Sequence, residues 1–475
     1  MSKIKNKKSL SPYLLVIISF LVVIIVGSFL LTTPFAQASG KWAFNLTYTA
    51  ANGETIHVTY LDCLFTAVSA TCVTGLCTFS QGIGNTLTLT GQIIVLIMIQ
   101  IGGLGFITVL TFVVTLFKSK LQFKDRVFLS QALNATNFAD VVKFVRKIVV
   151  ISLICESIGF LLGLPVVFIL YPDNIGKALW TSLFTSISAF NNAGFDTFGS
   201  TSLIADSTTI LGTLKEGTTW AYYYYLSYIM VLIVVGGLSF LVILEVFSFK
   251  KSAKQFSAFT KIVLTTNAIL LLSGWLIFYL TDGLFGSVKI SVFDALFQSV
   301  TCRTAGFATF DQDTLSTAGR TMSCFLMFVG GSPLSTAGGI KTTTVFIVFV
   351  AIFSHLKGRR VVSFNREYSS NTILKGMTLM VIAILVISLA FVGVSTFERN
   401  NASVNTERAF FEVFSAFGTV GLTANLTPLL GVGSKIILCV LMFLGRLGPM
   451  TFFQVFKNNV EVGHFKYIEE DFLVG

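Results

Sequence analysis

Long runs of apolar residues restrict the fold of this chain more than any other feature of its sequence. A bilayer core about 30 Å thick requires roughly 20 consecutive apolar residues per helix. Hydrophobic residues make up 54% of the chain and charged residues only 12%. The runs are Pro12–Leu31, Ile93–Leu116, Ile148–Tyr171, Tyr222–Phe247, Ile262–Leu280, Met377–Val394 and Ile436–Phe456. The sequence therefore predicts an all-α integral membrane protein.

The first run also resembles the core of a cleavable signal peptide. It follows the basic stretch Lys3–Lys8 and precedes the small residues of Ala36-Gln37-Ala38. However, the run is longer than the roughly 7–15 apolar residues of a signal core. We therefore predict that it remains as the first membrane helix.

The basic residues are concentrated on one side of the predicted membrane helices. Alternating the side at each run places 22 of the 33 Lys and Arg residues on the side of the N-terminus. They lie in Lys3–Lys8, Lys118–Lys147, Lys250–Lys261, Lys357–Lys375 and the tail after Phe456. Such a bias marks the cytoplasmic side, so both termini are predicted to be cytoplasmic. A net charge of +11 can indicate a nucleic-acid partner, but here the positive-inside bias accounts for it. We therefore predict no nucleic-acid partner. The acidic residues of the opposite side indicate either an acidic mouth that attracts cations or ordinary solvated loops.

Four short segments of the sequence align around a glycine. Each glycine follows a moderately apolar stretch that is too short to span a membrane, and a spanning run flanks the stretch on both sides. The glycines are Gly75, Gly194, Gly306 and Gly421, which lie 119, 112 and 115 residues apart. We predict four tandem units of helix, re-entrant pore loop and helix, with eight spans around one central pore. The predicted units are residues 1–117, 118–249, 250–357 and 358–475.

The repeated glycine loops predict an ion filter. Non-helical backbone at membrane depth is tolerated only where protein buries it or where it lines a water-filled cavity. Carbonyl groups around a pore can replace the hydration shell of a cation, and glycine permits the positive φ values that such a loop needs. The predicted filter residues are Thr74, Gly75, Ala193, Gly194, Ala305, Gly306, Val420 and Gly421, with potassium at the four glycines. The alternative is four ordinary glycine loops, which the near-equal spacing disfavours.

The motifs resemble those of the Ktr/Trk/HKT superfamily of potassium transporters over nearly the whole chain. Thr71-Cys72-Val73-Thr74-Gly75 and Thr304-Ala305-Gly306-Phe307 are the most specific segments. Because no further spans precede the first unit, the chain resembles the KtrB branch more than the longer TrkH branch. The resemblance implies potassium uptake across the plasma membrane by a homodimer with one pore per subunit. It also implies a cytosolic nucleotide-binding regulatory ring, like KtrA, made by another chain, and frequent stimulation of uptake by sodium.

A glycine-rich segment interrupts the second span of the third unit. Residues Gly330 to Lys341 contain four glycines and a proline, which cannot sustain a helix. In the superfamily the matching segment is an intramembrane gate loop below the filter. The resemblance therefore implies a gate that comprises Gly330, Gly331, Gly338, Gly339, Lys341 and Arg446. Leu334 stands where the family usually has glycine, and a simple helix kink is the alternative reading.

Several polar side chains lie within predicted spans and need partners. A central Arg or Lys costs roughly 2.5–3.5 kcal/mol on insertion scales. Arg446 and Lys341 resemble family positions that line the cavity, where a positive charge raises the barrier for cations or anchors the gate loop through carbonyl groups. A purely structural pairing of Arg446 with Glu156 is equally open. We expect Arg303 to brace the third filter loop by hydrogen bonds, and Asn191 and Asn192 are similar candidates.

The sequence contains no arrangement of residues that indicates an enzyme. It lacks a phosphate-binding loop, a paired carboxylate and a cluster of metal ligands, so we predict no organic cofactor and no enzymatic activity. The main rival function is sodium-coupled secondary transport, which also uses broken helices. A sodium-selective carrier is disfavoured by Gly75, because sodium-preferring plant relatives carry serine at the matching position. Channel-like flux and sodium-coupled symport are not distinguished.

Overall fold

The computed structural model describes residues 12–49, 55–105, 108, 141–199, 202–205, 209–247, 256–286, 289–402 and 404–448. The basic stretch at residues 3–8, most of those at residues 118–147 and 250–261, and the C-terminal tail lie outside the described residues. So do the predicted unit boundaries at residues 117/118 and 249/250. Predictions about these parts of the chain stay predictions.

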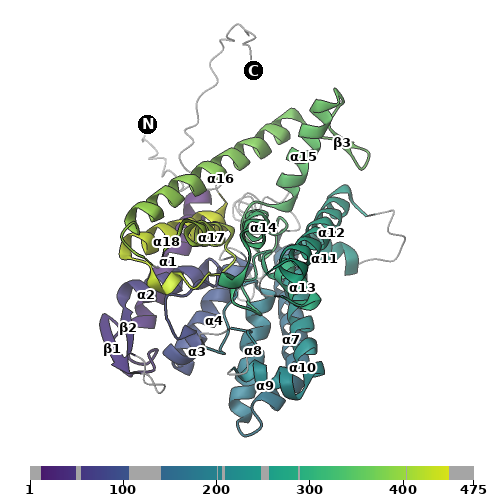
Figure 1. Ribbon diagram of the computed structural model, residues 1–475. Coiled ribbons are helices and arrows are strands. Elements are labelled where there is room, and N and C mark those ends of the chain that lie inside the picture. Colours follow the sequence, from purple (N-terminus) through teal and green to yellow (C-terminus); the bar gives the residue numbers. More distant parts are fainter. Residues whose placement is uncertain are drawn as a thin grey trace, which may run out of the picture.

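The described part of the chain is mostly helical and follows the order of the four sequence repeats (Figure 1). The first repeat contains α1 (Pro12–Thr32), β1 (Asn45–Thr49), β2 (Thr55–Thr59), α2 (Tyr60–Thr71), α3 (Gly82–Thr86) and α4 (Leu89–Leu104). The second contains α7 (Val141–Leu170), α8 (Ile175–Phe190), α9 (Ile210–Gly217), α10 (Thr219–Gly237) and α11 (Phe240–Phe247). The third contains α12 (Ala258–Phe278), a π-helical turn (Tyr279–Leu284), α13 (Val292–Thr301), α14 (Thr317–Phe328), α15 (Thr342–Leu356), β3 (Val362–Ser363) and β4 (Arg366–Glu367). The fourth contains α16 (Ser370–Phe397), α17 (Thr406–Gly418) and α18 (Val432–Leu447).

Two antiparallel hairpins depart from the all-α prediction. Strand β1 pairs with β2, and strand β3 pairs with β4. The two hairpins lie at opposite ends of the molecule (Figure 1). Both connect helices outside the apolar runs, so the helical membrane core is as predicted.

Within the described residues, four helices are long and apolar enough to cross a membrane, and three shorter apolar helices accompany them. The four long stretches are Val142–Leu170, Thr219–Gly237, Ala258–Leu284 and Ser370–Phe397, and the shorter helices are Val16–Thr32, Leu89–Leu104 and Thr342–Leu356. The apolar runs predicted at 93–116, 222–247 and 436–456 are not unbroken helices. Helix α4 ends at Leu104, α10 ends at Gly237 before α11, and α18 ends at Leu447. Glycines at or beside each of these ends explain the breaks, because glycine is a weak helix former.

The four repeats close into a ring through helix packing. In each repeat a long helix packs against a short one: α1 on α2, α7 on α8, α12 on α13 and α16 on α17. A later helix of each repeat, which we call its second helix, then packs against the short helix of the next repeat. These contacts are α4 on α8, α10 on α13, α14 on α17 and α18 on α2. The contact of α18 with α2 joins the last repeat to the first. The short helices therefore surround one axis.

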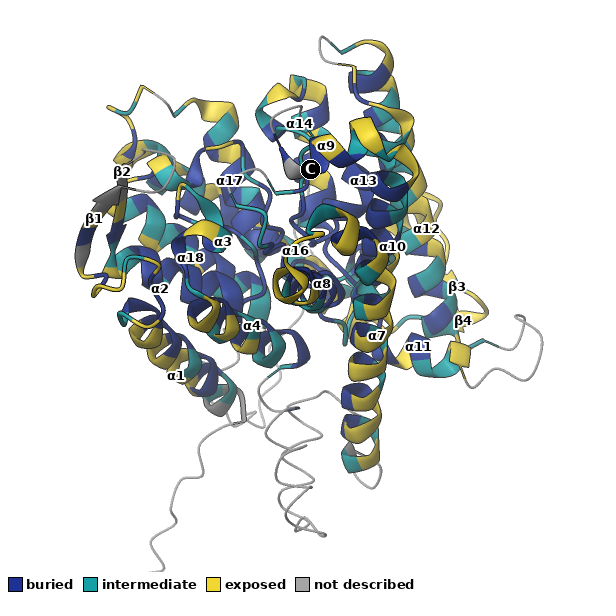
Figure 2. Cartoon of the chain, turned by 90° about the horizontal axis from the view of Figure 1, so that it is seen from below, coloured by how far each residue is buried: buried dark blue, intermediate teal, exposed yellow. Residues whose placement is uncertain are grey.

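Each short helix begins at a residue that can cap it. The side chains of Thr59, Asn174, Ser291 and Asn405 accept hydrogen bonds from backbone N–H groups in the first turns of α2, α8, α13 and α17. Capping satisfies donors that the helix itself leaves free. The buried residues gather around the centre of the molecule, whereas α1, α7 and α12 carry exposed apolar faces on the outside (Figure 2). Such an apolar exterior suits a lipid environment.

Glycines let the second helix of a repeat approach the C-terminal end of the short helix. A Cβ atom on Gly102, Gly236 or Gly445 would overlap the backbone oxygen of Thr71, Phe190 or Phe417, respectively. A side chain at these positions would therefore separate the two helices.

We predict that Gly236→Ala destabilises the protein, because the new methyl group overlaps the Phe190 carbonyl oxygen in a packed interior. Overpacking of this kind typically costs about 1–3 kcal/mol. The measurement is the thermal unfolding midpoint in detergent. Gly217→Ala is the matched control, since a Cβ atom there meets no atom within 4 Å. An unchanged midpoint for Gly236→Ala would contradict the close packing.

Candidate functional site

Four non-helical loops follow the short helices, and their backbones share one conformation. In each loop the predicted glycine has a positive φ, and so does the residue two positions before it. The φ values are 57° and 99° for Val73 and Gly75, 58° and 69° for Asn192 and Gly194, 70° and 83° for Thr304 and Gly306, and 50° and 95° for Thr419 and Gly421. Positive φ is strained for residues other than glycine, so its repetition at Val73, Asn192, Thr304 and Thr419 shows that the surrounding structure imposes it. We call these four segments the filter loops.

The four glycines meet at the centre of the ring. A Cβ atom on Gly75 would lie 2.6 Å from the Ala193 carbonyl oxygen, and one on Gly194 would lie 2.7 Å from that of Ala305. A Cβ atom on Gly306 would overlap the Val420 oxygen, and one on Gly421 would overlap the Thr74 oxygen. Each glycine thus faces a carbonyl group of the next loop in cyclic order. The sequence-predicted filter residues are brought together at one place.

The backbone donors of the filter loops are used, but the acceptors at the ring are not. The backbone N–H groups of Thr74, Ala193 and Val420 donate to the carbonyl oxygens of Ser69, Ser188 and Ser415 at 2.8, 2.8 and 2.9 Å, and that of Ala305 donates to Thr301 at 2.9 Å. Among the described residues, the carbonyl oxygens of Thr74, Ala193, Ala305 and Val420 accept no hydrogen bond. Buried carbonyl groups need a partner. A desolvated cation at the ring would satisfy them.

A cavity of about 390 Å³ opens above the ring. All four glycines line it, together with the carboxylates of Asp196 and Asp311 and the amides of Gln312 and Asn425. Two acids at a cavity that ends on unpaired carbonyl groups favour cations over anions. Two of the acids on the side opposite the basic stretches thus lie at one cavity, and the acidic mouth stays a prediction.

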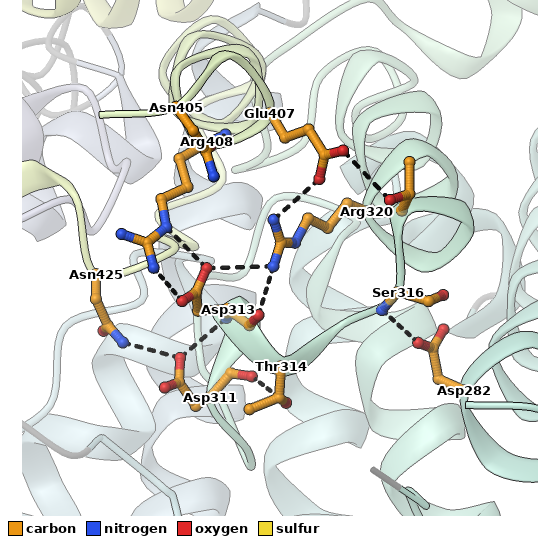
Figure 3. A network of polar contacts seen from close by, with 11 residues as sticks. Asp282, Asp311, Asp313, Thr314, Ser316, Arg320, Asn405, Glu407, Arg408 and Asn425 are labelled. Atoms are coloured by element: carbon orange, nitrogen blue, oxygen red, sulfur yellow. Dashed lines mark hydrogen bonds and ion pairs between the residues drawn. The ribbon is translucent and has the colours of Figure 1, made fainter. Parts of the chain in front are cut away.

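An ion-pair network at the rim of this cavity joins the third and fourth repeats (Figure 3). The Asp313 carboxylate accepts from Arg408 Nε at 2.9 Å and forms an ion pair with Arg408 Nη2. Arg320 Nη2 lies 3.2 Å from Asp313, and Arg320 Nη1 lies 3.1 Å from Glu407. Asp311, which lines the cavity, accepts hydrogen bonds from Asn425 Nδ2 and from the N–H group of Asp313, both at 2.9 Å.

A second ion pair joins the fourth repeat to the first. Lys435 Nζ lies 2.8 Å from Asp62 Oδ1. Burial alone would raise the pKa of the Asp62 carboxyl, but hydrogen bonds from Lys435 and Thr59 outweigh burial and leave that pKa lowered. The carboxylate is therefore held in its charged form at the start of α2.

The segment from Gly330 to Lys341 is non-helical and separates α14 from α15, at the position that the sequence indicated. Three basic side chains donate to its carbonyl oxygens. Lys341 Nζ donates to Ala337 O at 2.6 Å, Arg303 Nη2 donates to Gly330 O at 2.9 Å, and Arg446 Nη1 donates to Thr336 O. We call residues 330–341 the broken segment.

The contacts of two of these basic residues bear on the sequence expectations. Arg303 was expected to brace the third filter loop by hydrogen bonds, and its guanidinium group ties that loop to Gly330 O of the broken segment and to Asn267 Oδ1, the latter at 2.8 Å. Arg446 does not pair with Glu156. Its Nη2 atom donates to the carbonyl oxygens of Gly102 and Gly103, the latter at 3.0 Å. Arg446 thus ties the broken segment to α4 through carbonyl groups.

The break between α10 and α11 forms a seat for the broken segment. The N–H groups of Ser332 and Thr336 donate to the carbonyl oxygens of Gly237 and Gly236, at 3.1 and 3.3 Å. The N–H group of Phe240 donates to Leu334 O at 2.9 Å. Leu334 has a φ of 55°, which is a conformation that glycine adopts more easily. Leu334 therefore holds this backbone conformation under local strain.

The sequence analysis missed one repeated motif that the structure makes evident. The pairs Gly102-Gly103, Gly236-Gly237, Gly330-Gly331 and Gly445-Arg446 lie at the breaks of the second helix in the four repeats. A second alignment around these glycines would have found the breaks, and it would have shown that Arg446 replaces a glycine.

Comparisons with known proteins agree with this geometry. Residues 32–464 match the family model TrkH, described as cation transport protein. The chain belongs to the TrkH family of cation transport proteins. The potassium/sodium uptake protein NtpJ of Enterococcus hirae is 35% identical over 482 residues, which cover 100% of this chain and 99% of that protein. The Ktr system potassium uptake protein B of Bacillus subtilis is 32% identical, with 98% of this chain and 97% of that protein covered.

A solved structure shows the same fold. A crystal structure of the potassium transporter TrkH from Vibrio parahaemolyticus matches with a TM-score of 0.67 and 17% identity over 96% of this chain and 87% of that one. Membership of the TrkH family and the apolar helices identify a multi-pass plasma-membrane protein. Because the family consists of transport proteins, the chain is a transporter and not an enzyme.

We predict that Asp313→Ala lowers the thermal unfolding midpoint, because it leaves Arg320 and Arg408 without their shared carboxylate. Since these side chains are partly exposed, the loss should be about 1 kcal/mol and should shrink at high salt. Arg360→Ala is the control, because its pair with Glu367 is 3.8 Å long and highly exposed. Equal midpoints for Asp313→Ala and the wild type would show that the rim network does not join the repeats energetically.

Proposed function

We propose that this TrkH-family chain is the ion-translocating subunit of a Ktr-type potassium uptake system. The observation that carries the proposal is the ring of carbonyl groups at Thr74, Ala193, Ala305 and Val420, which accept no hydrogen bond among the described residues. The full-length similarity to proteins named for potassium uptake supports the choice of ion. Potassium is then the transported ion at Gly75, Gly194, Gly306 and Gly421.

The proposed architecture is four helix, re-entrant loop and helix units, with eight spans and both termini in the cytoplasm. The short helices α2, α8, α13 and α17 are the half-helices of this scheme, and their C-terminal ends adjoin the filter loops. A helix C-terminus carries partial negative charge, so four of them around the ring favour a cation. The cavity with Asp196 and Asp311 is then the outer mouth.

The broken segment is the proposed gate. A Cβ atom on Gly338 would overlap Thr419 Oγ1, so the segment touches the fourth filter loop. Its carbonyl groups are held by Lys341, Arg303 and Arg446, which link it to the third filter loop, to α18 and to α4. A segment held by few discrete contacts can change between two arrangements, as switching elements do. Arg446 also places a positive charge beside the ion path.

The proposed partners are a second copy of this chain and a cytosolic nucleotide-binding ring like KtrA. The exposed basic residues from Lys357 to Arg366 are part of the docking surface that we propose for the ring. Sodium is a possible second ion, because one relative is named a potassium/sodium uptake protein. Sodium-selective or sodium-coupled transport is therefore the second candidate function.

We predict that Gly75→Ser lowers the ratio of potassium to sodium uptake. The serine Cβ atom would lie 2.6 Å from the Ala193 carbonyl oxygen, and the residue would keep a φ of 99° only under strain. The loop must shift, and the ring must widen or distort. Uptake of both ions is measured in cells that lack their own potassium transporters. Gly40→Ser is the matched control, with a φ of 66° and no neighbour within 4 Å. A wild-type ratio in correctly inserted Gly75→Ser protein would refute the filter assignment.

We predict that shortening the broken segment between Gly331 and Gly338 raises ion flux in the absence of the regulatory ring, with selectivity largely retained. Arg446→Ala should act in the same direction, because it releases Thr336 O from α4 and α18. The measurement is flux through purified protein in liposomes, without and with the regulator. Arg399→Ala, at an exposed arginine, is the control. If flux stays low and fully dependent on the regulator, the gate lies elsewhere.

A further inference from the structure

A buried carboxylate lies among amide side chains behind the second filter loop. Glu156 on α7 is 5% exposed and Asn191 at the end of α8 is fully buried. Asn191 Nδ2 donates to Glu156 Oε1 at 3.0 Å, and Gln100 Nε2 donates to the two Glu156 oxygens at 2.9 and 3.1 Å. Asn191 Nδ2 also donates to Gln100 Oε1 at 3.0 Å and to Ile187 O at 2.9 Å. These three side chains, which we call the amide–carboxylate triad, connect α4, α7 and α8.

The triad presents only donors to the carboxylate. Within the described residues, no lysine or arginine side chain lies within ion-pair distance of Glu156. A charge in the membrane is costly, and the C-terminal end of α8 repels a carboxylate through the helix dipole. A glutamine would fill the same space without this cost. The carboxylate therefore needs an explanation that packing alone does not give.

Asn191 stands next to the strained part of the second filter loop. It caps α8 with φ of −78° and ψ of −2°, and the next residue, Asn192, has a φ of 58°. Ala193, whose carbonyl oxygen faces Gly75, follows directly. Because hydrogen bonds to Glu156, Gln100 and Ile187 hold the Asn191 side chain, the turn that aims the Ala193 carbonyl group is fixed from behind. A Cβ atom on Gly103 would overlap Asn191 Oδ1, so α4 also limits its movement.

The third filter loop is held by a matching contact, whereas the first and fourth filter loops lack one. Arg303 occupies the same position relative to Gly306 as Asn191 does relative to Gly194, and it binds Asn267 of α12. Asn267 is the counterpart of Glu156 on the first long helix of its repeat. The matching residues of the first and fourth loops are Cys72 and Gly418, which cannot make such contacts. Anchoring through the side chain three residues before the glycine is thus a property of the second and third loops, whereas in the first and fourth loops the N–H groups of Gly75 and Gly421 donate to Ser69 and Ser415 Oγ.

We propose that Glu156 is a positioning residue for the second filter loop. It acts through Asn191 to fix the Ala193 carbonyl group, and so it contributes to the preference for potassium over sodium. This inference rests on the proposed function of the chain as a potassium transporter. It assigns a selectivity role to a side chain that does not touch the ion.

The test compares Glu156→Leu and Glu156→Gln with the wild type, as purified full-length protein in liposomes under potassium or sodium gradients. Glu156→Leu removes the hydrogen bonds of Asn191 and Gln100 to the carboxylate and leaves only Gln100 Oε1 and Ile187 O to hold Asn191. The potassium-to-sodium ratio should therefore fall roughly tenfold. Glu156→Gln keeps an acceptor for Asn191 and should lie between Glu156→Leu and the wild type. Glu398→Gln is the matched control. Glu398 is a buried acid that accepts from Gly431 N at 2.7 Å and Asn401 Nδ2 at 3.1 Å, outside the filter loops. Its substitution should affect stability without changing the ratio.

An exchange of the two side chains separates positioning from folding. The double variant Gln100→Glu with Glu156→Gln keeps one carboxylate and two amides in the triad, and it should restore the ratio toward that of the wild type. If Glu156→Leu does not insert, Gln100→Leu is the second variant. It removes the contacts of α4 with Glu156 and Asn191 but keeps the Asn191–Glu156 hydrogen bond, so it should lower the ratio by less. Wild-type ratios in all inserted triad variants would overturn the inference. If the wild type itself does not prefer potassium, the proposed function fails and the triad is not the cause.

Discussion

The need to satisfy backbone polar groups inside a lipid bilayer governs this structure. Helices satisfy their own groups, so every departure from a helix at membrane depth needs another partner. The chain departs in two ways. In the filter loops the N–H groups return to the short helices, and within the part of the chain that the structure describes the carbonyl groups at the ring accept no hydrogen bond. In the broken segment the side chains of Lys341, Arg303 and Arg446 supply donors to the carbonyl groups. The first arrangement suits a passing cation, and the second holds a piece of chain in place.

Glycine makes both arrangements possible, but for different reasons. At Gly75 a positive φ and the nearby Ala193 oxygen exclude any side chain. At Gly236 the conformation is helical, and the need is only for a close approach of α10 to the end of α8. The same residue type therefore sets the width of the ring in one place and the spacing of helices in the other. Composition alone cannot separate these two uses.

The sequence sufficed to predict the elements that repeat. The spacing of the four glycines, the short apolar stretches before them and the glycine-rich break at residues 330–341 are all visible in one sequence. Contacts between distant segments were harder to predict. Nothing in the local sequence shows that Arg303 reaches Gly330, 27 residues away, or that Arg446 reaches Gly102 and Gly103. The pairing of Arg446 depends on the cyclic packing that places the fourth repeat beside the first.

The breaks in α4 and α10 are bridged by hydrogen bonds from other repeats. Carbonyl groups at a helix break lose their helical donors and need others. The third repeat supplies them to the second, because Ser332 and Thr336 donate to Gly237 and Gly236. The fourth supplies them to the first, where Arg446 stands in place of a glycine and donates to Gly103. The second repeat donates in turn to the third through Phe240 and Leu334 O, and Arg446 also donates to Thr336 O. The broken segment is thus hydrogen-bonded to the repeats on both sides of its own, so any movement of it must exchange contacts with both.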